Sequence, residues 1–376
     1  MKLRQLPHEV DQRRDRLIAN LRDTIPQTRR AALELDRNAA FPAQEVNQLR
    51  QLGALAAPVP VALGGLGTGT EPEGALPLMQ VLRLIGRGSL SLGRLYEAHV
   101  NALHLIFRYG TAVQASRAAN DALEGHLFAL WVTDAPDAPL FLDDLFLLRG
   151  AKFPCSGAGY ATRALVTARR PSGEARMLVI SLRPGEHAEP SAWDAHGMRA
   201  TASGRVTLDG LRTDPASLIG IAGDYLREPD FSAGAWRTSA VTLGGLEALV
   251  DELRRHLVAR SRESDPHQLT RVGEALIAQE TAHLWVRSAA QLAEASDADA
   301  SDIACAVNLA RIAVEKACLD AIRIVQRALG LSGFRRGELT ELLYRDLSIY
   351  LRQPAPDEAL TEAAAHFMQR DLPAIS

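Results

Sequence analysis

The chain has 376 residues, a formal net charge of −3, and a composition that is 47% hydrophobic and 23% charged. This length accommodates two or three domain-sized units with substantial cores, and the composition is that of a globular protein. The nearly neutral charge gives no electrostatic argument for nucleic acid or an acidic membrane surface as a partner.

The cysteines and the N-terminal segment limit the compartment in which we expect the protein. Cys155, Cys305 and Cys318 are widely spaced and lack any Cys-x-x-Cys or Cys/His grouping, so neither a disulfide framework nor a metal site is predicted. Residues 1–16 are charged where a signal peptide needs an apolar core, and no uncharged apolar run approaches membrane-spanning length. We therefore expect a cytoplasmic protein with reduced thiols and no membrane span.

The N-terminal third is predicted to be helical. Apolar residues recur at helical spacing over residues 8–35, 42–52 and 76–107. The glycines of residues 58–67 are not followed by the Lys-Ser/Thr pair of a P-loop. His99 and His104 lie five positions apart and so do not share a helix face, which argues against paired metal ligands. We expect residues 1–125 to form an N-terminal helical domain.

The pattern changes near Leu127 and changes again near Phe231. Short apolar or alternating runs separated by Asp, Pro and Gly predict a compact antiparallel β-barrel or sandwich over residues 126–222. Long amphipathic stripes over residues 236–257, 269–295 and 303–329, followed by a shorter one over 339–351, then predict a C-terminal four-helix bundle over residues 223–376. The expected fold is an α+β multidomain protein.

A loop of small residues precedes the last predicted strand. Residues 197–203 carry glycine, alanine and hydroxyl side chains, and the alternating residues 205–209 form the strand. Small residues allow the backbone to approach an anionic or planar ligand closely. An ordinary hairpin with small turn residues is the alternative on pattern alone.

Several motifs in the right order resemble the acyl-CoA dehydrogenase family. The residues 197–203 match its GMR-x-T-x-S loop, residues 150–158 match its G-x-K-x-x-x-S-G-A strand pair, and residues 344–346 match its YRD motif. The resemblance covers nearly the whole chain. It implies an N-terminal helical domain, a middle β domain and a C-terminal four-helix bundle, with an FAD between the last two.

The resemblance also assigns residues to the flavin end of that FAD. Thr133 and Ser156 stand where the family places hydroxyls against the pyrimidine side and the N5 edge of the flavin. Pro154 stands where an aromatic side chain usually covers the flavin. Arg199 and Arg237 are expected to contact the substrate.

The rest of the FAD is placed by the resemblance against the bundle of a neighbouring subunit. Arg262 remains from an R-x-x-F-G loop whose Phe-Gly is lost, and a solvated charged turn is the alternative there. Arg327 replaces the Gln of a Q-x-x-G-G-x-G-Y turn. The expected cofactor-binding residues in this half are Arg262, Gln268, Arg327, Gly330 and Gly333.

The catalytic base is the clearest departure from the family. Pro354 stands where the usual catalytic Glu follows the YRD motif, and Trp236 stands at the other position used within the family. Asp357 is the nearest candidate base, and Glu358 is the next. Both also fit an ordinary acidic first turn of the final helix.

These observations lead to one principal prediction and two alternatives. The principal prediction is an FAD-dependent acyl-CoA dehydrogenase-like oxidoreductase that desaturates a CoA- or carrier-protein-linked acyl group, with Asp357 as a displaced base and an electron-transfer partner or oxygen as acceptor. The alternatives are a flavin-dependent monooxygenase or oxidase, for which loss of the base is no handicap, and a catalytically silent assembly partner. We also expect a homodimer or homotetramer, because the successive residues Leu284, Trp285 and Val286 offer apolar surface on two sides of one helix.

Overall fold

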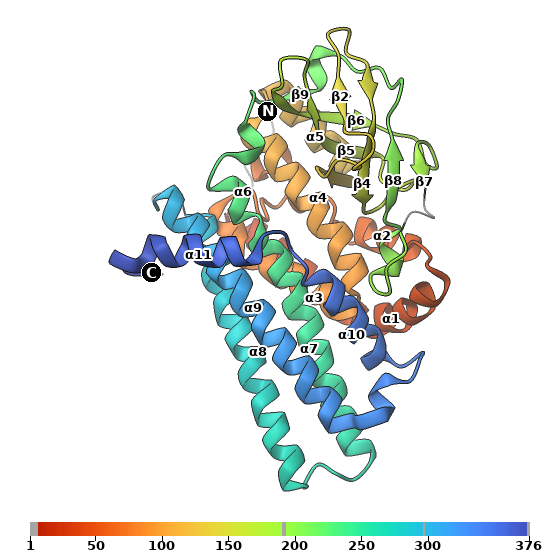
Figure 1. Cartoon of the computed structure of the whole chain (residues 1–376), viewed down its shortest axis with the longest axis vertical. Helices are drawn as coiled ribbons and strands as arrows, with labels where there is room; N and C mark the ends of the chain where they lie inside the picture. The colour runs from red at the N-terminus through yellow and green to blue at the C-terminus, as the bar shows by residue number, and fades with distance from the viewer. Residues whose placement is uncertain (1–6, 190–192, 296–297, 374–376) are drawn as a thin grey trace.

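The computed structural model describes residues 7–189, 193–295 and 298–373 (Figure 1). Over these residues five helices come first, then nine short strands, then a second helical half, so the expected order of helices, strands and helices is confirmed. The first helices are α1 (Pro7–Asn38), α2 (Ala43–Gln51), α3 (Ala75–Gly88), α4 (Leu90–Tyr109) and α5 (Ala112–Leu123). No helix within the described residues is long and apolar enough to cross a membrane.

The strands form two sheets that sit above α4 in Figure 1. One has the order β3-β2-β5-β6-β9 with β1 also paired to β5, and the other has the order β4-β8-β7. Their bounds are β1 (Phe128–Trp131), β2 (Phe141–Leu142), β3 (Leu148–Arg149), β4 (Ala151–Cys155), β5 (Arg163–Arg169), β6 (Ala175–Ser181), β7 (Ala188–Glu189), β8 (Gly204–Thr207) and β9 (Leu218–Ile219).

The sequence pattern predicted an antiparallel arrangement, but the sheets also contain parallel pairs. β1 and β2 each pair with β5 in parallel. A parallel pairing needs a crossover of a dozen or more residues, and the chain between β1 and β5 is long enough to supply one. Period-two alternation marks a strand but carries no information on the direction of its neighbour.

The C-terminal half contains three long helices that pack along one another, with shorter helices at their ends. α7 (Ala235–Ala259), α8 (Pro266–Ala293) and α9 (Ala300–Leu329) form the bundle, and α10 (Leu339–Tyr350) and α11 (Pro356–His366) cross it (Figure 1). Short helical turns complete the chain: α6 (Asp230–Ala233), η1 (Val61–Leu63), η2 (Pro72–Gly74), η4 (Arg199–Thr201), η5 (Pro215–Ser217), η6 (Asp224–Leu226), η7 (Gly330–Phe334) and η8 (Phe367–Gln369).

A single hydrophobic core joins the N-terminal helices to the bundle, whereas the sheets enclose a smaller core of their own. The joint is the crossing of α3 and α7, where glycines bring the two backbones together. A Cβ on Gly244 would lie 2.0 Å from the carbonyl oxygen of Arg83, and one on Gly86 would lie 2.2 Å from that of Val241. Ion pairs border the crossing, including Arg83 with Glu247 at 2.7 Å.

His99 connects α4 to the β domain as a packed, neutral side chain. Its Nδ1 accepts the Phe128 N–H at 3.1 Å, which leaves Nε2 to donate to the Leu55 carbonyl at 2.8 Å. Burial lowers the pKa of His99 to about 4. Its role is therefore structural, while His104 points to the cleft described below.

The glycine contact between α3 and α7 predicts that two glycine-to-alanine substitutions, one at the contact and one away from it, change the free energy of unfolding in opposite directions. Gly244→Ala should lower the free energy of unfolding by about 1–3 kcal/mol, because the new methyl group meets backbone that cannot move aside. Gly273→Ala in α8, where an added Cβ meets nothing within 4 Å, should raise it by about 0.5–1 kcal/mol. Thermal and urea unfolding of the two variants measure this difference, and two equal effects would contradict the close crossing.

Candidate functional site

A cleft of about 660 Å³ opens where the β domain meets the helices. Its walls come from the ends of β1 and β4, the 193–203 loop, α4, the start of α7, and the segment that joins α10 to α11. Figure 1 shows α4 running under the sheets towards the point where α10 and α11 cross the bundle. This volume is within the range of small-molecule and cofactor sites.

The wall formed by the β domain presents a row of hydroxyl groups. Thr133, Ser156, Thr201 and Ser203 all line the cleft. The Ser156 and Ser203 hydroxyl oxygens are 3.3 Å apart, and those of Thr201 and Ser203 are 2.8 Å apart. The structure thus brings the predicted cofactor residues Thr133 and Ser156 onto the same wall as the loop of small residues.

A buried lysine braces this wall from behind. The Lys152 ammonium donates to the Val132 carbonyl at 2.9 Å and to the Asp134 carboxylate at 2.6 Å, on either side of Thr133. A third bond goes to the Thr167 hydroxyl at 3.0 Å, and the side chain is only 1% exposed. Burial lowers the pKa of Lys152, and Asp134 opposes that shift by favouring the charged form.

Lys152 was recognised in the sequence only as part of a motif, with no role assigned. The available signal was its residue type, because the chain uses lysine at only three positions and arginine elsewhere. An ammonium can donate three bonds in a compact space, which a planar guanidinium cannot do.

The 197–203 loop is held in place by α10. The Asp346 carboxylate accepts the Met198 N–H at 2.6 Å, and Gly197 packs so tightly that a Cβ would lie 2.3 Å from the Arg345 carbonyl oxygen. Met198 and Ala202 both have left-handed backbone, with φ of 56° and 45°. Burial raises the pKa of the Asp346 carboxyl to about 7, although the bond from Met198 favours its ionised form.

The helical wall carries a buried carboxylate that is fully engaged. Glu97 on α4 is 3% exposed and accepts from Arg94, from Asn101 and from the Thr238 hydroxyl. Burial alone would lower the pKa of Arg94, but the Glu97 carboxylate beside it produces a net rise. Tyr350 lines the same side, and burial, reinforced by Glu97, raises its pKa well above the usual value.

A second carboxylate at the cleft, Asp230, is also engaged. It accepts from the Tyr109 hydroxyl at 2.5 Å, from Arg108 at 3.2 Å, and lies 3.3 Å from His104 Nε2. Burial alone would raise the pKa of Asp230, but the bonds from His104 and Tyr109 outweigh it and hold that pKa well below the usual range. Asp230 therefore stays ionised and paired.

The two family positions for the base carry no acid in this structure. Pro354 lines the cleft, and Trp236 is fully buried at the start of α7. Asp357 is exposed in the first turn of α11 and is not among the residues that line the cleft. Glu358 does line it, on the exposed side near the mouth.

Comparison with known proteins identifies the fold of this chain. A sequence model described as the acyl-CoA dehydrogenase N-terminal domain matches residues 13–126. Glutaryl-coenzyme A dehydrogenase in complex with glutaryl-CoA superposes with a TM-score of 0.82 at 20% identity, over 98% of this chain and 97% of that one. The chain has the acyl-CoA dehydrogenase fold. The family resemblance and the fold class predicted from the sequence are confirmed.

Other proteins to which this chain is similar carry different names. KijD3 in complex with FMN and a dTDP-linked amino sugar superposes with a TM-score of 0.83 at 21% identity, over 96% of this chain and 94% of that one. "Amino sugar nitrososynthase DnmZ" of Streptomyces peucetius is 26% identical over 64% of this chain, and the match spans only 62% of DnmZ. "Probable FMNH2-dependent monooxygenase SfnC" of Pseudomonas putida is 24% identical over 85% of each chain.

Within this fold, the remaining predicted cofactor residues lie far from the cleft. They occupy the opposite end of the bundle, at the turn from α7 to α8 and at the end of α9 (Figure 1): Arg262, Gln268, Arg327, Gly330 and Gly333. Arg262 is paired with Asp265 at 2.8 Å, and Gln268 is 1% exposed and donates to the Ala328 carbonyl at 3.4 Å. One chain therefore does not bring these residues together with Thr133 and Ser156.

The two predicted substrate contacts also lie apart. Arg237 lines the cleft, but its guanidinium is paired with Glu294 at 2.8 Å and donates to Asn101 at 3.0 Å. Arg199 lines a separate cavity on another side of the 197–203 loop. The Arg237 guanidinium is therefore already paired, and Arg199 does not line the cleft.

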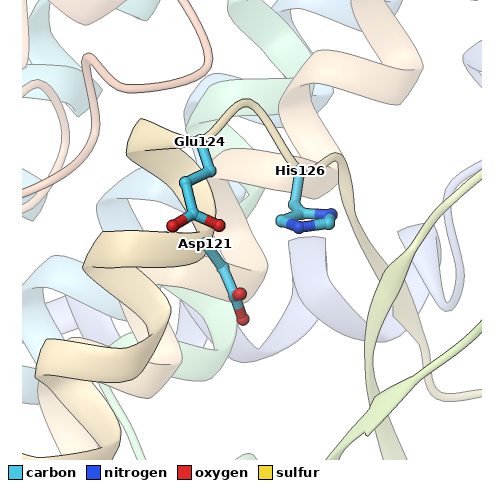
Figure 2. Close-up of side chains that lie close together, drawn as sticks. All are labelled: Asp121, Glu124 and His126. Carbon is cyan, nitrogen blue, oxygen red and sulfur yellow. The ribbon is translucent and has the colours of Figure 1, made fainter.

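Figure 2 shows a group of possible metal ligands, Asp121, Glu124 and His126, at the end of α5. Both oxygens of Asp121 accept from Arg163, at 2.7 and 2.8 Å, and His126 Nδ1 lies 2.8 Å from the Thr162 hydroxyl. A guanidinium already neutralises the central carboxylate, so this cluster supports no metal site.

The buried Asp346 yields a pH-dependent prediction. Its folded-state pKa of about 7 exceeds the value of about 3.9 expected in the unfolded chain, so stability is lost as pH rises from about 4 to about 7. Asp346→Asn keeps an acceptor for Met198 without the charge, and should be more stable than the wild type at pH 8 by a few kcal/mol. The advantage should shrink steadily towards pH 4.

Thermal unfolding across this pH range measures the effect. Asp357→Asn removes an exposed carboxylate and serves as the control, with no pH-dependent advantage expected. Parallel pH profiles for Asp346→Asn and the wild type would contradict the burial of a titrating carboxyl at this position.

Proposed function

We propose that this protein is a flavin-dependent monooxygenase that oxygenates a nitrogen or sulfur atom of a small molecule, and that it is not a thioester dehydrogenase. A bound reduced flavin supplies the two electrons with which dioxygen is split between the substrate and water. The names of DnmZ and SfnC support this class, as do the FMN and the dTDP-linked amino sugar bound to KijD3. The observation that carries the proposal lies in this chain's own cleft.

That observation is the state of the carboxylates around the cleft. Removing a thioester α-proton requires a carboxylate within hydrogen-bond reach whose pKa is raised towards neutrality. Pro354 and Trp236 occupy the family positions, Glu97 is held by three donors, and the pKa of Asp230 is lowered. The exposed position of Asp357 gives no support to its predicted role as a displaced base.

Three carboxylates among the residues that line the cleft disfavour coenzyme A as the carrier of the substrate, and Arg311 and Arg352 of the same lining oppose this effect. The three carboxylates are those of Glu228, Glu358 and Glu362. Glu228 accepts from the Ser232 hydroxyl at 2.6 Å and its N–H at 3.0 Å, which are neutral groups that leave its charge uncompensated. Coenzyme A carries several phosphate charges, and like charges placed together cost affinity.

The residues of the β wall fit a flavin. Its ring system is planar, with carbonyl and nitrogen acceptors along one edge, and Thr133, Ser156 and Ser203 offer hydroxyl donors in a row on one wall. The lysine brace fixes the backbone on both sides of Thr133. Thr133, Ser156 and Ser203 are therefore the residues that we propose hold the cofactor.

We propose FMN as that cofactor in place of the FAD expected from the sequence. The residues expected to hold the rest of the FAD, beyond its flavin, have other partners in this chain. Arg262 is paired with Asp265, and Gln268 is buried. The names of SfnC and of the KijD3 complex refer to FMNH2 and FMN. The partner implied is then a separate flavin reductase that supplies the reduced cofactor.

The helical wall would serve to orient the substrate and keep water out. Tyr350 remains a neutral hydrogen-bond donor at physiological pH, because its pKa lies well above its usual value. The Arg94 guanidinium lines the cleft and offers donors there, and its pairing with Glu97 leaves no net charge. Both are placed on α4 and α10, which are rigid elements packed against the core.

The test supplies reduced FMN from a reductase and follows oxygen uptake and product formation with amine and organosulfur substrates. We expect FMN to bind more tightly than FAD, and Ser156→Ala to weaken FMN binding by about tenfold, the usual scale for losing one hydrogen bond to a ligand. Ser301→Ala, at an exposed serine in the first turn of α9, is the matched control and should bind as the wild type does. Protein that binds no flavin would reject the proposal and leave the silent-partner alternative.

We further propose that two copies of the chain pair through α8. Four apolar side chains lie exposed along one face of this helix, namely Leu269 at 53%, Leu276 at 39%, Ile277 at 69% and Leu284 at 56%. Their spacing of seven and eight residues places them in one stripe. A symmetric dimer is the usual way to cover such a surface.

Light scattering at micromolar concentration measures the assembly. Ile277→Asp combined with Leu284→Asp should convert a dimer or larger oligomer to smaller species, because the charges would be buried in the interface. Val113→Asp alters an equally exposed apolar residue on α5 and should leave the mass unchanged. A monomeric wild type would contradict the pairing.

A further inference from the structure

A second cavity, of about 600 Å³, lies beside the 197–203 loop and shares no lining residue with the cleft. It is open to solvent on one side and is lined by three parts of the chain that are distant in sequence. These are the end of α1, residues 194–196 with Arg199, and the segment from Arg336 into α10. The volume is that of a small-molecule site.

The carboxylates on its α1 and α10 sides are both hydrogen-bonded to one arginine, which balances one of their two negative charges. Arg345 binds Asp36 at 2.7 and 3.1 Å and Glu341 at 2.6 and 3.0 Å, so all four carboxylate oxygens are engaged. The Arg345 guanidinium also donates to the His196 carbonyl at 2.7 Å. This ion-pair network forms a fixed side of the cavity rather than a set of groups available to a ligand.

Three guanidinium groups remain available. The side chains of Arg37, Arg199 and Arg336 line the cavity and make no hydrogen bond or ion pair with any residue in the described parts of the chain. Among the described residues that line the cavity, Asp194 is the one carboxylate with no hydrogen bond or ion pair to another described residue. Guanidinium groups bind phosphate oxygens in pairs of parallel hydrogen bonds, and three of them match a ligand with two phosphate groups.

We propose that this cavity binds a small molecule that carries a diphosphate or two phosphate groups, with Arg37, Arg199 and Arg336 as its ligands. The uncharged surfaces of Leu33 and Ala195 leave room for an organic portion beside the phosphates. The site is separate from the cleft, so its occupant is neither the flavin nor the substrate to be oxygenated.

The position of Arg199 places such a ligand next to the cleft wall. Arg199 begins the helical turn η4, which ends at Thr201, and the Thr201 hydroxyl is 2.8 Å from that of Ser203 on the cleft side. Its neighbour Met198 is tied to Asp346. The loop therefore has one face on each cavity.

Calorimetric titration with inorganic pyrophosphate and with ADP, on protein with and without FMN, tests the proposal. We expect binding to both forms, and Arg199→Gln and Arg336→Gln each to weaken it by about tenfold, the scale of one charge-assisted hydrogen bond. Arg335→Gln makes the same charge change at an exposed neighbour that does not line the cavity, and should bind as the wild type does. Unchanged thermal unfolding checks that each variant is folded.

Three outcomes would overturn the proposal. The first is no binding of either probe at millimolar concentration. The second is an equal loss of affinity in Arg335→Gln and Arg336→Gln, which would show general attraction to a basic surface. The third is binding that disappears when FMN is present, which would place the probe in the cleft.

Discussion

The hydrogen bond from the Met198 N–H to the buried Asp346 carboxylate joins the β domain to the helical bundle, and both cavities depend on it. It fixes a loop whose backbone is left-handed at Met198 and Ala202, a conformation that non-glycine residues adopt only when their surroundings enforce it. Gly197 permits the contact because any side chain there would strike the Arg345 carbonyl. The hydroxyl row of the cleft and the position of Arg199 both follow from where this loop is held.

The periodic features of the sequence predicted the fold well. The stripes of α7, α8 and α9 are long enough that helical spacing could not be confused with alternation, and the short runs bounded by Gly and Pro marked the strands. The prediction did not foresee that α3 packs on α7 through glycines and so shares a core with the bundle. A glycine inside a helix signals only lower helix propensity in the sequence, whereas Gly86 and Gly244 serve a contact between segments distant in sequence.

The site was predicted in part, for a similar reason. Thr133 and Ser156 lie on one cleft wall because short motifs fix local backbone, and the backbone carries these side chains into place. The brace by Lys152 and the engagement of Glu97 depend on partners from other elements, and no spacing in the sequence encodes them. Spacing alone left Asp357 either as a displaced base or as part of an ordinary acidic first turn, and the structure places it exposed in the first turn of α11.

The fold is that of the acyl-CoA dehydrogenases, and its cleft has hydroxyl donors for a flavin. The carboxylates of the cleft are hydrogen-bonded to other side chains, have a lowered pKa, or lie on its exposed side. A base of the kind that thioester desaturation needs would be a solitary, buried carboxyl, and Asp346, whose pKa is about 7, instead serves to hold a loop. Oxygen chemistry has no need of such a base, because a nitrogen or sulfur atom reacts through its lone pair and no C–H bond has to be broken.

The most direct measurement is an anaerobic titration of the flavin-loaded protein with short, medium and branched acyl-CoAs, followed by flavin absorbance. We expect the oxidised flavin to keep its colour with every acyl-CoA, and to be bleached only when an external reductant is added. Bleaching by any acyl-CoA would contradict the central claim, because it would show that this cleft still removes a proton and a hydride from a thioester.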